Sequence, residues 1–495
     1  MARLHPLDLP EIRNHLALFL PRHELTVCAR LSHVWYYSLL PYIWSELRIV
    51  PVGSFCSKNI PPLALARGSS CIQKLDYIGK PKTHLGSLHC PKLKHLTLHW
   101  YDQFVLDFIR RHRITLKGLT FAVIKDQDEN KQNNHEFWET AMSCPRLESL
   151  SVSGVHITRQ DLPHFWGLWS QLTFLKLSML DIHLPGLEES SGAVFTRIKE
   201  LELDGVGGRT QLQLLAWCPE LVSLIWRRPF HHVSDSFSSD LKSIGNLLSD
   251  YTQYCPKLIR LTVEVNATSA DDEILPFLKS RSNAPIERLS LKKNWFGEAT
   301  WSHLQQSHHR HKLKILELKG VRGKMVQEIL CSLPNLTSIS APWIQDIDMI
   351  EDPRPWVCLG LTRWSICIDL VQKETSQRMV FERLGTLQSL ETLDLAKVES
   401  RGKNHRPLGN VQFLSFGLDH GLDSLRNLRK LNCLSLLETP QEMDAEDLYW
   451  MLENWPRLGH LYGTLHPDGL MGQTLRGILV AGMVLPRIDC GVSVS

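Results

Sequence analysis

The stretch Cys-Pro-Lys-Leu-Lys-His-Leu-Thr-Leu at residues 90–98 contains a word that recurs along most of this chain. Three more Cys-Pro pairs begin at Cys144, Cys218 and Cys255. In each of the four, a leucine two residues after the proline opens an L-x-x-L-x-apolar word. A word repeated at fixed internal spacing marks a unit that cannot bury its apolar face alone and stacks on copies of itself. The pattern therefore predicts a repeat architecture.

The first apolar position of each word serves as an anchor, and fifteen candidate units follow along the chain. Their average spacing of about 28 residues lies at the long end of the range for leucine-rich repeats. The words at Leu336, Leu361 and Leu458 are the weakest, with Ala341, Ile366 and Gly463 at the third position. The anchors are Ile72, Leu93, Leu116, Leu147, Leu172, Ile198, Leu221, Leu258, Ile286, Leu313, Leu336, Leu361, Leu390, Leu428 and Leu458.

Each word predicts a short strand, with its last two apolar side chains on one face and the residues between them on the other. Helical spacing occurs between words, for example over 137–142 and 325–330. The Cys-Pro pair fits the junction, because proline ends a helix and cysteine fills a small buried slot. We predict an α/β leucine-rich-repeat solenoid over residues 49–495, with parallel strands inside and helices outside. A small all-α module over residues 1–48 precedes it.

Four long gaps between words have the polar, Ser/Asn/Gly/Pro-rich composition of exposed loops. Insertions in repeat proteins often gather on the binding face, so these segments are candidate contact sites; surface decoration is the alternative. The gaps are Asp126 to Glu136, His231 to Asp240, Pro342 to Pro355 and Lys397 to Asn410.

Composition narrows the class of protein. The chain has 55 basic and 52 acidic side chains and a formal net charge of +3, so nothing in it requires a nucleic acid partner. Four of the twelve cysteines recur at one point of the repeat, as small buried apolar residues do, and the chain has no C-x-x-C pair for zinc. No signal-peptide pattern and no apolar run of about 20 residues is present, so we expect no membrane contact and a cytoplasmic or nuclear location.

We expect no catalytic residues, no metal site and no cofactor, since no nucleophile, base and orienting group follow a known signature. The run His308 to His311 could suggest a metal site, but a solvated helix end is the better interpretation. The segment Gly205 to Thr210 lacks the ending of a phosphate-binding loop and is expected to be a turn. The Cys-Pro thiols are expected to be buried and inert. We therefore predict that the chain is not an enzyme.

Residues 1–48 do not carry the word. Ile12, Leu16 and Leu20 follow helical spacing, and a second helix is expected to run from Glu24 to Trp35. Three short helices in so few residues make a thin core, and a module of this size usually needs a partner to complete it.

This module resembles an F-box. The resemblance is carried by Leu9-Pro10-Glu11-Ile12, Leu31-Ser32, Trp35, and Pro41 followed by Trp44. The order of an F-box followed by repeats with a Cys-Pro-x-Leu word resembles the F-box/leucine-rich-repeat class, so the resemblance covers nearly the whole chain.

The resemblance implies a substrate-recognition subunit of a Skp-cullin-F-box (SCF) ubiquitin ligase. In that family the F-box binds a Skp-type adaptor, and through it a cullin, while the rest of the chain captures a protein that is then ubiquitinated and degraded. The alternatives are an F-box-containing scaffold without a role in ubiquitination, and an enzymatic site in the 342–355 insertion or the C-terminal tail. The implied adaptor-binding residues are Leu9, Pro10, Ile12, Leu16, Leu20, Leu25, Leu31, Trp35, Pro41 and Trp44.

Substrate binding is expected on the inner face of the sheet, from the side chains between the buried leucines. An acidic triplet followed by later arginines suggests a bipolar recognition surface. The alternative is that solvent-facing strand positions are polar in any case. The candidates are His95, His99, Phe174, Lys176, Glu200, Glu202, Asp204, Arg227, Arg260, Arg288, Lys292, Glu317 and Lys319.

Overall fold

A computed structural model of the protein describes residues 7, 9–50, 60, 62–78, 88–99, 102–122, 134–155, 157–178, 197–204, 214–227, 254–264, 271–281, 284–372, 374–395, 413–437, 439 and 441–482. The chain forms two units. The first is Met1–His231 with Tyr254–Lys257, and the second is His232–Gln253 with Leu258–Ser495.

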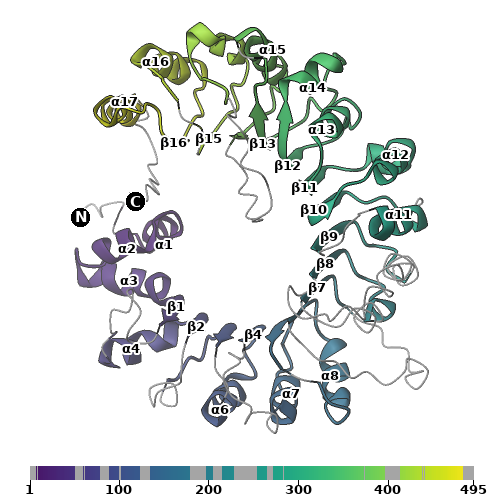
Figure 1. Ribbon diagram of the computed structural model, residues 1–495. Coiled ribbons are helices and arrows are strands. Elements are labelled where there is room, and N and C mark those ends of the chain that lie inside the picture. Colours follow the sequence, from purple (N-terminus) through teal and green to yellow (C-terminus); the bar gives the residue numbers. More distant parts are fainter. Residues whose placement is uncertain are drawn as a thin grey trace. The chain divides into compact units, whose positions relative to one another are not determined.

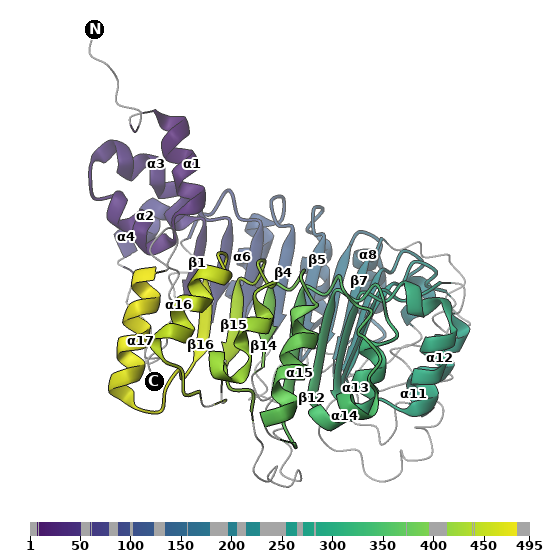
Figure 2. The same cartoon turned by 90° about the horizontal axis from the view of Figure 1, so that it is seen from above.

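Three helices open the first unit, and they lie beside its first strand (Figures 1 and 2). They are α1 (Pro10–Phe19), α2 (Arg22–Cys28) and α3 (His33–Trp44). The number of helices agrees with the sequence prediction, but the second helix is shorter than predicted. It ends at Cys28, and Trp35 belongs to α3, whose start is capped by the Ser32 hydroxyl accepting a hydrogen bond from Trp35 N at 3.3 Å.

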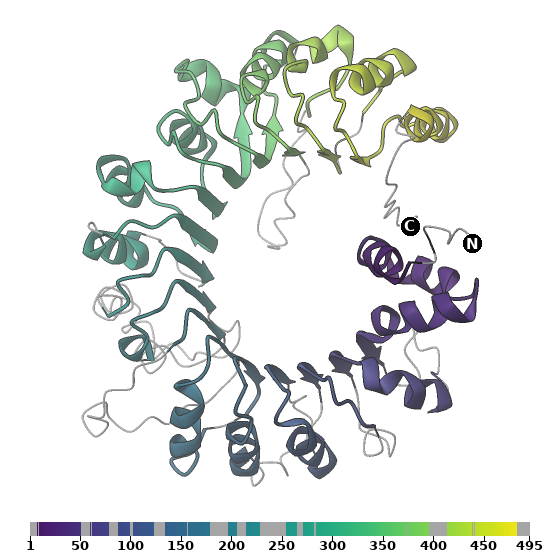
Figure 3. The same cartoon turned by 180° about the vertical axis from the view of Figure 1, so that it is seen from behind.

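The rest of the first unit alternates strands with helices. Its described strands pair in chain order, and every pair is parallel. The strands lie on the inner side of the curved unit and the helices on the outer side (Figures 1 and 3). The elements are β1 (Glu46–Ile49), α4 (Pro62–Gly68), η2 (Ser69–Cys71), β2 (Lys74–Tyr77), β3 (His95–Leu98), α6 (Gln103–His112), β4 (Gly118–Ala122), α7 (Asn134–Met142), β5 (Ser149–Ser153), α8 (Leu162–Trp169), β6 (Phe174–Ser178), β7 (Glu200–Asp204), η5 (Leu214–Trp217) and β8 (Ser223–Arg227).

The second unit repeats this arrangement with longer strands in its middle. Its strands also pair in chain order and in parallel. The elements are β9 (Arg260–Glu264), α11 (Asp271–Ser280), β10 (Arg288–Trp295), α12 (Glu298–Gln306), η7 (His308–His311), β11 (Ile315–Gly320), α13 (Gly323–Leu330), β12 (Ser338–Gln345), α14 (Asp346–Glu351), β13 (Arg363–Asp369), α15 (Glu374–Gly385), β14 (Thr392–Asp394), η8 (Leu418–His420), η9 (Leu422–Leu425), β15 (Cys433–Leu436), α16 (Ala445–Asn454), β16 (His460–Gly463) and α17 (Gly469–Gly482).

The core of each unit is a ladder built from the central apolar residue of every word. In the first unit the partners are Leu47, Leu75, Leu96, Leu119, Leu150, Leu175, Leu201 and Leu224, and all are buried. In the second they are Leu261, Leu289, Leu316, Ile339, Trp364, Leu393, Leu434 and Leu461, of which only Leu461 is half-buried. Each unit is therefore an α/β leucine-rich-repeat solenoid, as predicted.

The predicted anchors agree with the strands, with one correction. Every anchor except Leu428 lies two residues before a strand. The true anchor of β15 is Leu431, and Leu428 occupies the turn position that Cys90 occupies before Leu93. The same backbone bond identifies this position, from Leu431 N to Leu428 O at 2.9 Å and from Leu93 N to Cys90 O at 3.0 Å. Because leucine replaces cysteine at this position, Leu428, Leu431 and Cys433 match the L-x-x-L-x-apolar word three residues before the true one.

The repeat sheet also begins earlier than predicted. β1 pairs with β2 and buries Leu47 against Leu75, so the first repeat starts inside residues 1–48. Its word was missed because Trp44 stands in the anchor position, two residues before the strand, where the other words have leucine or isoleucine.

One predicted insertion is not a loop. Residues 342–355 continue β12 and then form α14, with Ile344 and Met349 buried. The Asp346 carboxylate, itself fully buried, accepts hydrogen bonds from Val371 N at 2.8 Å and Gln372 N at 3.0 Å, which fixes this segment to the next repeat. The insertions at 231–240 and 397–410 lie outside the described residues, as does 126–133 of the insertion at 126–136.

The run His308 to His311 forms η7, and it is not simply a solvated end. His308 and His311 are exposed, but His309 is fully buried. Its Nδ1 accepts a hydrogen bond from Ile286 N at 3.1 Å, and its Nε2 donates to Leu278 O at 3.2 Å. This neutral imidazole links η7 to the preceding repeat, and burial lowers its pKa from the ordinary value.

In the part of the chain that the structure describes, no helix is long and apolar enough to cross a membrane.

The buried imidazole of His309 predicts a pH-dependent contribution to stability. Because its pKa is lowered by folding, the contribution is complete above the unfolded pKa of about 6.5 and is lost as the pH falls below it. We expect the stability difference between the wild type and His309→Gln to shrink as the pH falls from 7.5 to 5.5. Urea unfolding at several pH values measures this. A difference that stays constant with pH would contradict the assignment.

Candidate functional site

The three N-terminal helices expose a dense set of large apolar side chains. Leu18 and Tyr37 are each 69% exposed, and Leu31 is 68% exposed. Scattered exposed apolar residues are ordinary on a monomer, so a concentration within some thirty residues is a candidate interaction surface. The set, here called the apolar helical surface, comprises Leu7, Leu9, Leu18, Phe19, Val27, Leu31, Val34, Tyr36 and Tyr37.

The small size of the module explains this exposure. Its core consists of Ala17, Leu25, Ala29 and Leu39, with Leu20, Cys28, Trp35, Tyr42 and Ile43 packed around it. Two of the four central residues are alanines, so the helices bury few of their large side chains. A buried arginine braces them: Arg13 Nε donates to Ser38 Oγ at 3.1 Å, and Arg13 Nη1 donates to Leu7 O at 3.3 Å.

The residues predicted to bind an adaptor fall into three groups. Leu9, Pro10, Leu31 and Pro41 are exposed. Ile12, Leu16, Leu20, Trp35 and Trp44 are half-buried. Leu25 is only 4% exposed and belongs to the core of the module, which gives it a structural role.

Trp44 of the predicted set packs against the first repeat. Its indole lies where the Cβ of any residue replacing Gly68 would stand, so the ring packs against α4. This contact and its anchor position join the helices to the first repeat. The structure thus places Trp44 at the junction of module and repeats.

Sequence reasoning missed seven members of the apolar helical surface. They are Leu7, Leu18, Phe19, Val27, Val34, Tyr36 and Tyr37. A signal was available in the run Leu16-Ala17-Leu18-Phe19-Leu20, which is apolar on every side of a helix. A helix in a three-helix module can bury only one side, so such a run predicts exposed apolar surface.

The inner face of the first unit carries ladders of ion pairs between neighbouring strands. Lys176 Nζ lies 2.9 Å from Glu202 Oε2, and Arg227 Nη1 lies 3.7 Å from the same oxygen. Near the other end, Asp76 lies 3.3 Å from Arg48 Nε and 3.7 Å from His99 Nε2. His95, Phe174, Glu200 and Asp204 complete the predicted set on β3, β6 and β7.

The inner face of the second unit has a similar pairing. Arg288 Nη2 donates to Glu317 Oε1 at 2.7 Å, and Ser290 Oγ donates to Glu317 Oε2 at 2.7 Å. Arg260 and Arg288 are register partners on β9 and β10. Lys292 is half-buried and Lys319 is exposed on the same face, at alternate positions from the buried leucines.

These pairs change the interpretation of the inner faces. Glu202, the centre of the acidic triplet, is shared by cations on both flanking strands and is 17% exposed. The charges therefore partly neutralise one another within each face. Partly exposed ion pairs stabilise the fold by only about 0.2–1 kcal/mol each. Their main effect is to fix long side chains in a set pattern.

The described cysteines are free thiols, and most are buried. Burial raises the pKa of the Cys90 and Cys358 thiols to about 12 and that of Cys144 to about 11. A thiol with so high a pKa is a poor nucleophile at neutral pH. Among the described residues no group of three His, Cys, Asp or Glu side chains is arranged to hold a metal ion. The segment 205–210 lies outside the described residues.

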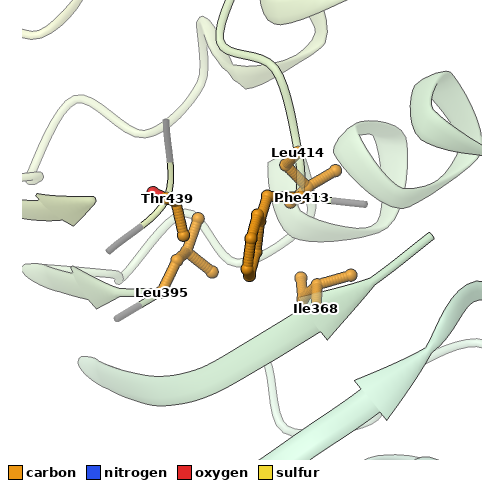
Figure 4. Close-up of a pocket in the computed structure, with 5 residues that line it drawn as sticks. All are labelled: Ile368, Leu395, Phe413, Leu414 and Thr439. Carbon is orange, nitrogen blue, oxygen red and sulfur yellow. The ribbon is translucent and has the colours of Figure 1, made fainter. Parts of the chain in front are cut away.

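A small apolar recess lies where β13, β14 and the following segments meet. Figure 4 shows Phe413 between Ile368 and Leu395, with Leu414 and Thr439 around it. The space between these side chains does not admit a water molecule. The recess is packing space in the core and offers no room for a ligand.

Comparisons with known proteins leave the family open. No family model matches the chain. No curated protein matches it. Among solved structures, the crystal structure of a TLR13-ssRNA13 complex is similar to this chain at 13% sequence identity and a TM-score of 0.37, over 80% of this chain and 67% of the other.

The buried thiols predict a labelling pattern. At pH 8, iodoacetamide is expected to alkylate Cys90, Cys144 and Cys358 of the folded protein at least about a hundredfold more slowly than the same residues in urea. The half-buried Cys71 serves as the matched control within the same chain. Peptide mass spectrometry measures each site. Equal labelling rates in the folded and unfolded protein would contradict the burial of the repeat cysteines.

Proposed function

We propose that this chain is the substrate-recognition subunit of an SCF-type ubiquitin ligase. In this proposal the N-terminal helices are an F-box that binds a Skp-type adaptor and, through it, a cullin. The leucine-rich repeats hold a target protein, which is ubiquitinated and then degraded. The chain itself performs no covalent chemistry.

The apolar helical surface is the observation that carries the proposal. Its residues are exposed in the isolated chain, although burial of one large apolar side chain contributes about 1.5–3 kcal/mol. A helical partner that covers this surface would complete the thin core beneath it. The resemblance of Leu9-Pro10 and Leu31-Ser32 to F-box positions supports an adaptor as that partner, since three of these four are exposed apolar residues.

The repeats support the second half of the proposal. Their inner faces present rows of polar side chains held in a fixed pattern by ion pairs across strands. A rigid patterned surface suits recognition of a folded protein, since little side-chain entropy is lost on binding. Holding the target beside a charged conjugating enzyme would raise the effective concentration of its lysines.

A scaffold is the second candidate function. In it the same helices bind the adaptor only for assembly, and the protein bound by the repeats is not degraded. The exposed apolar helices and the patterned inner faces are compatible with both functions, so the turnover of the bound protein must decide between them.

Adaptor binding tests the first half of the proposal. We expect Leu31→Asp to weaken the Kd for a purified Skp-type adaptor at least about tenfold, because it places a charge in the apolar contact. Leu9→Ala combined with Pro10→Ala is expected to act in the same direction. Leu359→Asp is the matched control, since Leu359 is 55% exposed but lies in the second unit. Isothermal titration calorimetry measures the affinities.

Two results would overturn adaptor binding: no affinity of the wild-type protein for the adaptor, or an unchanged Kd in both module variants. Circular dichroism of each variant shows that its fold is retained. The altered side chains are exposed, so unfolding is not expected to confuse the result.

Turnover of the bound protein tests the second half. A pull-down with the Leu31→Asp chain identifies proteins held by the repeats. We expect such a protein to accumulate and to gain half-life in cells that express only this variant. An unchanged half-life would favour the scaffold over the ligase subunit.

A further inference from the structure

An open depression on the second unit lies outside every surface described so far. It has a volume of about 590 Å³ and is formed by the end of α12 and by η7. The described residues that line it are all polar: His303, Gln305, Gln306, Ser307, His308, Arg310 and His311.

The buried His309 explains why these side chains gather here. Its two hydrogen bonds, to Ile286 N and Leu278 O, anchor η7 to the preceding repeat. With His309 turned into the core, its neighbours His308, Arg310 and His311 are left exposed around it. The fold thus holds a short basic segment in a fixed position.

Several donors in the depression lack protein partners. Arg310 Nε donates to Ser332 O at 2.9 Å, which fixes the guanidinium, and the terminal nitrogens make no hydrogen bond with the described part of the chain. The imidazoles of His308 and His311 likewise have no hydrogen-bond partner among the described residues.

The charge of the lining selects the class of ligand. Of the described residues around the depression none is a carboxylate, whereas Arg310 is permanently cationic and each histidine ring can donate an N–H hydrogen bond. A guanidinium binds phosphate oxygens with two parallel hydrogen bonds. A phosphate monoester carries about −1.5 to −2 charge and three acceptor oxygens, so it can use more of these donors than a carboxylate can.

We propose that this depression, the basic depression, binds a phosphate group. Arg310 holds two of its oxygens, and His308 and His311 donate to the remainder. The source is either a phosphorylated side chain of another protein or a small free phosphate compound. This site lies far along the sequence from the N-terminal helices and stands independently of the proposed ligase function.

Calorimetric titration of the full chain at pH 6.0 and constant ionic strength tests the site. The probes are inorganic phosphate, N-acetyl-phosphoserine amide and acetate. We expect both phosphates to bind more tightly than acetate, and Arg310→Gln to weaken phosphate binding about tenfold. The double variant His308→Gln with His311→Gln is expected to weaken it too, and it removes no hydrogen bond of the described fold. Arg429→Gln changes an exposed arginine elsewhere in the second unit and is expected to leave binding unchanged.

The relative affinities of the probes show which kind of phosphate compound the site binds, and other results would contradict the proposal. Tighter binding of the phosphoserine compound than of inorganic phosphate assigns the site to phosphorylated proteins, and the reverse order assigns it to small phosphates. The proposal is wrong if the wild type binds no phosphate or if acetate binds equally well. It is also wrong if both variants of the depression bind phosphate like the wild type. None of these results depends on whether the adaptor binds.

Discussion

The in-register ladder of central apolar residues is the constraint on which the rest of this structure depends. Each strand is only a few residues long and buries its leucine against the leucine of the next strand, as Leu96, Leu119 and Leu150 do. A slip of one residue would turn these side chains to the solvent face, so the register is strongly fixed. Once it is fixed, the residues between the leucines must form rows on the opposite face. The positions of Lys176, Glu202 and Arg227 follow from packing on the other side of the sheet.

Buried polar side chains connect repeats where the outer elements are irregular. Gln377 in α15 donates from Nε2 to Ser415 O at 2.8 Å, and its Oε1 accepts from Ser415 N at 3.2 Å. Gln441 binds the same segment through Phe416 N at 2.9 Å and Leu414 O at 3.0 Å. His309 and Asp346 also form hydrogen bonds with backbone groups of neighbouring repeats in the second unit. These side chains form hydrogen bonds with backbone groups that are not paired within a regular helix. A buried backbone group left without a hydrogen bond would cost free energy.

The strands were predictable because an L-x-x-L-x-apolar word specifies both a strand and its buried face. The errors occurred where another large apolar residue imitated or replaced a leucine: Leu428 fills the cysteine slot, and Trp44 fills an anchor. The segment 342–355 was misjudged because its burial depends on Asp346, whose partners lie about 25 residues away. Ion pairs such as Lys176–Glu202 could not be predicted from the sequence, because the strand register decides which residues lie side by side. The exposure of Leu18 and Phe19 was readable from their apolar run, but only once the helix was known to have a single buried side.

The apolar helical surface and the inner faces of the repeats differ in the free energy of desolvation that a bound partner would require. Covering the apolar helical surface gains free energy at every leucine or aromatic ring, with few polar groups to desolvate. A protein bound on an inner face must instead desolvate charges that already have partners, such as Glu202 between Lys176 and Arg227. Such a surface adds little affinity unless the partner's polar groups match the existing pattern, while a mismatch leaves a charge unpaired. On this argument the helices would supply strong, general affinity, and the repeats would supply discrimination among partners. The proposed receptor, which would bind one adaptor and select among targets, requires this division.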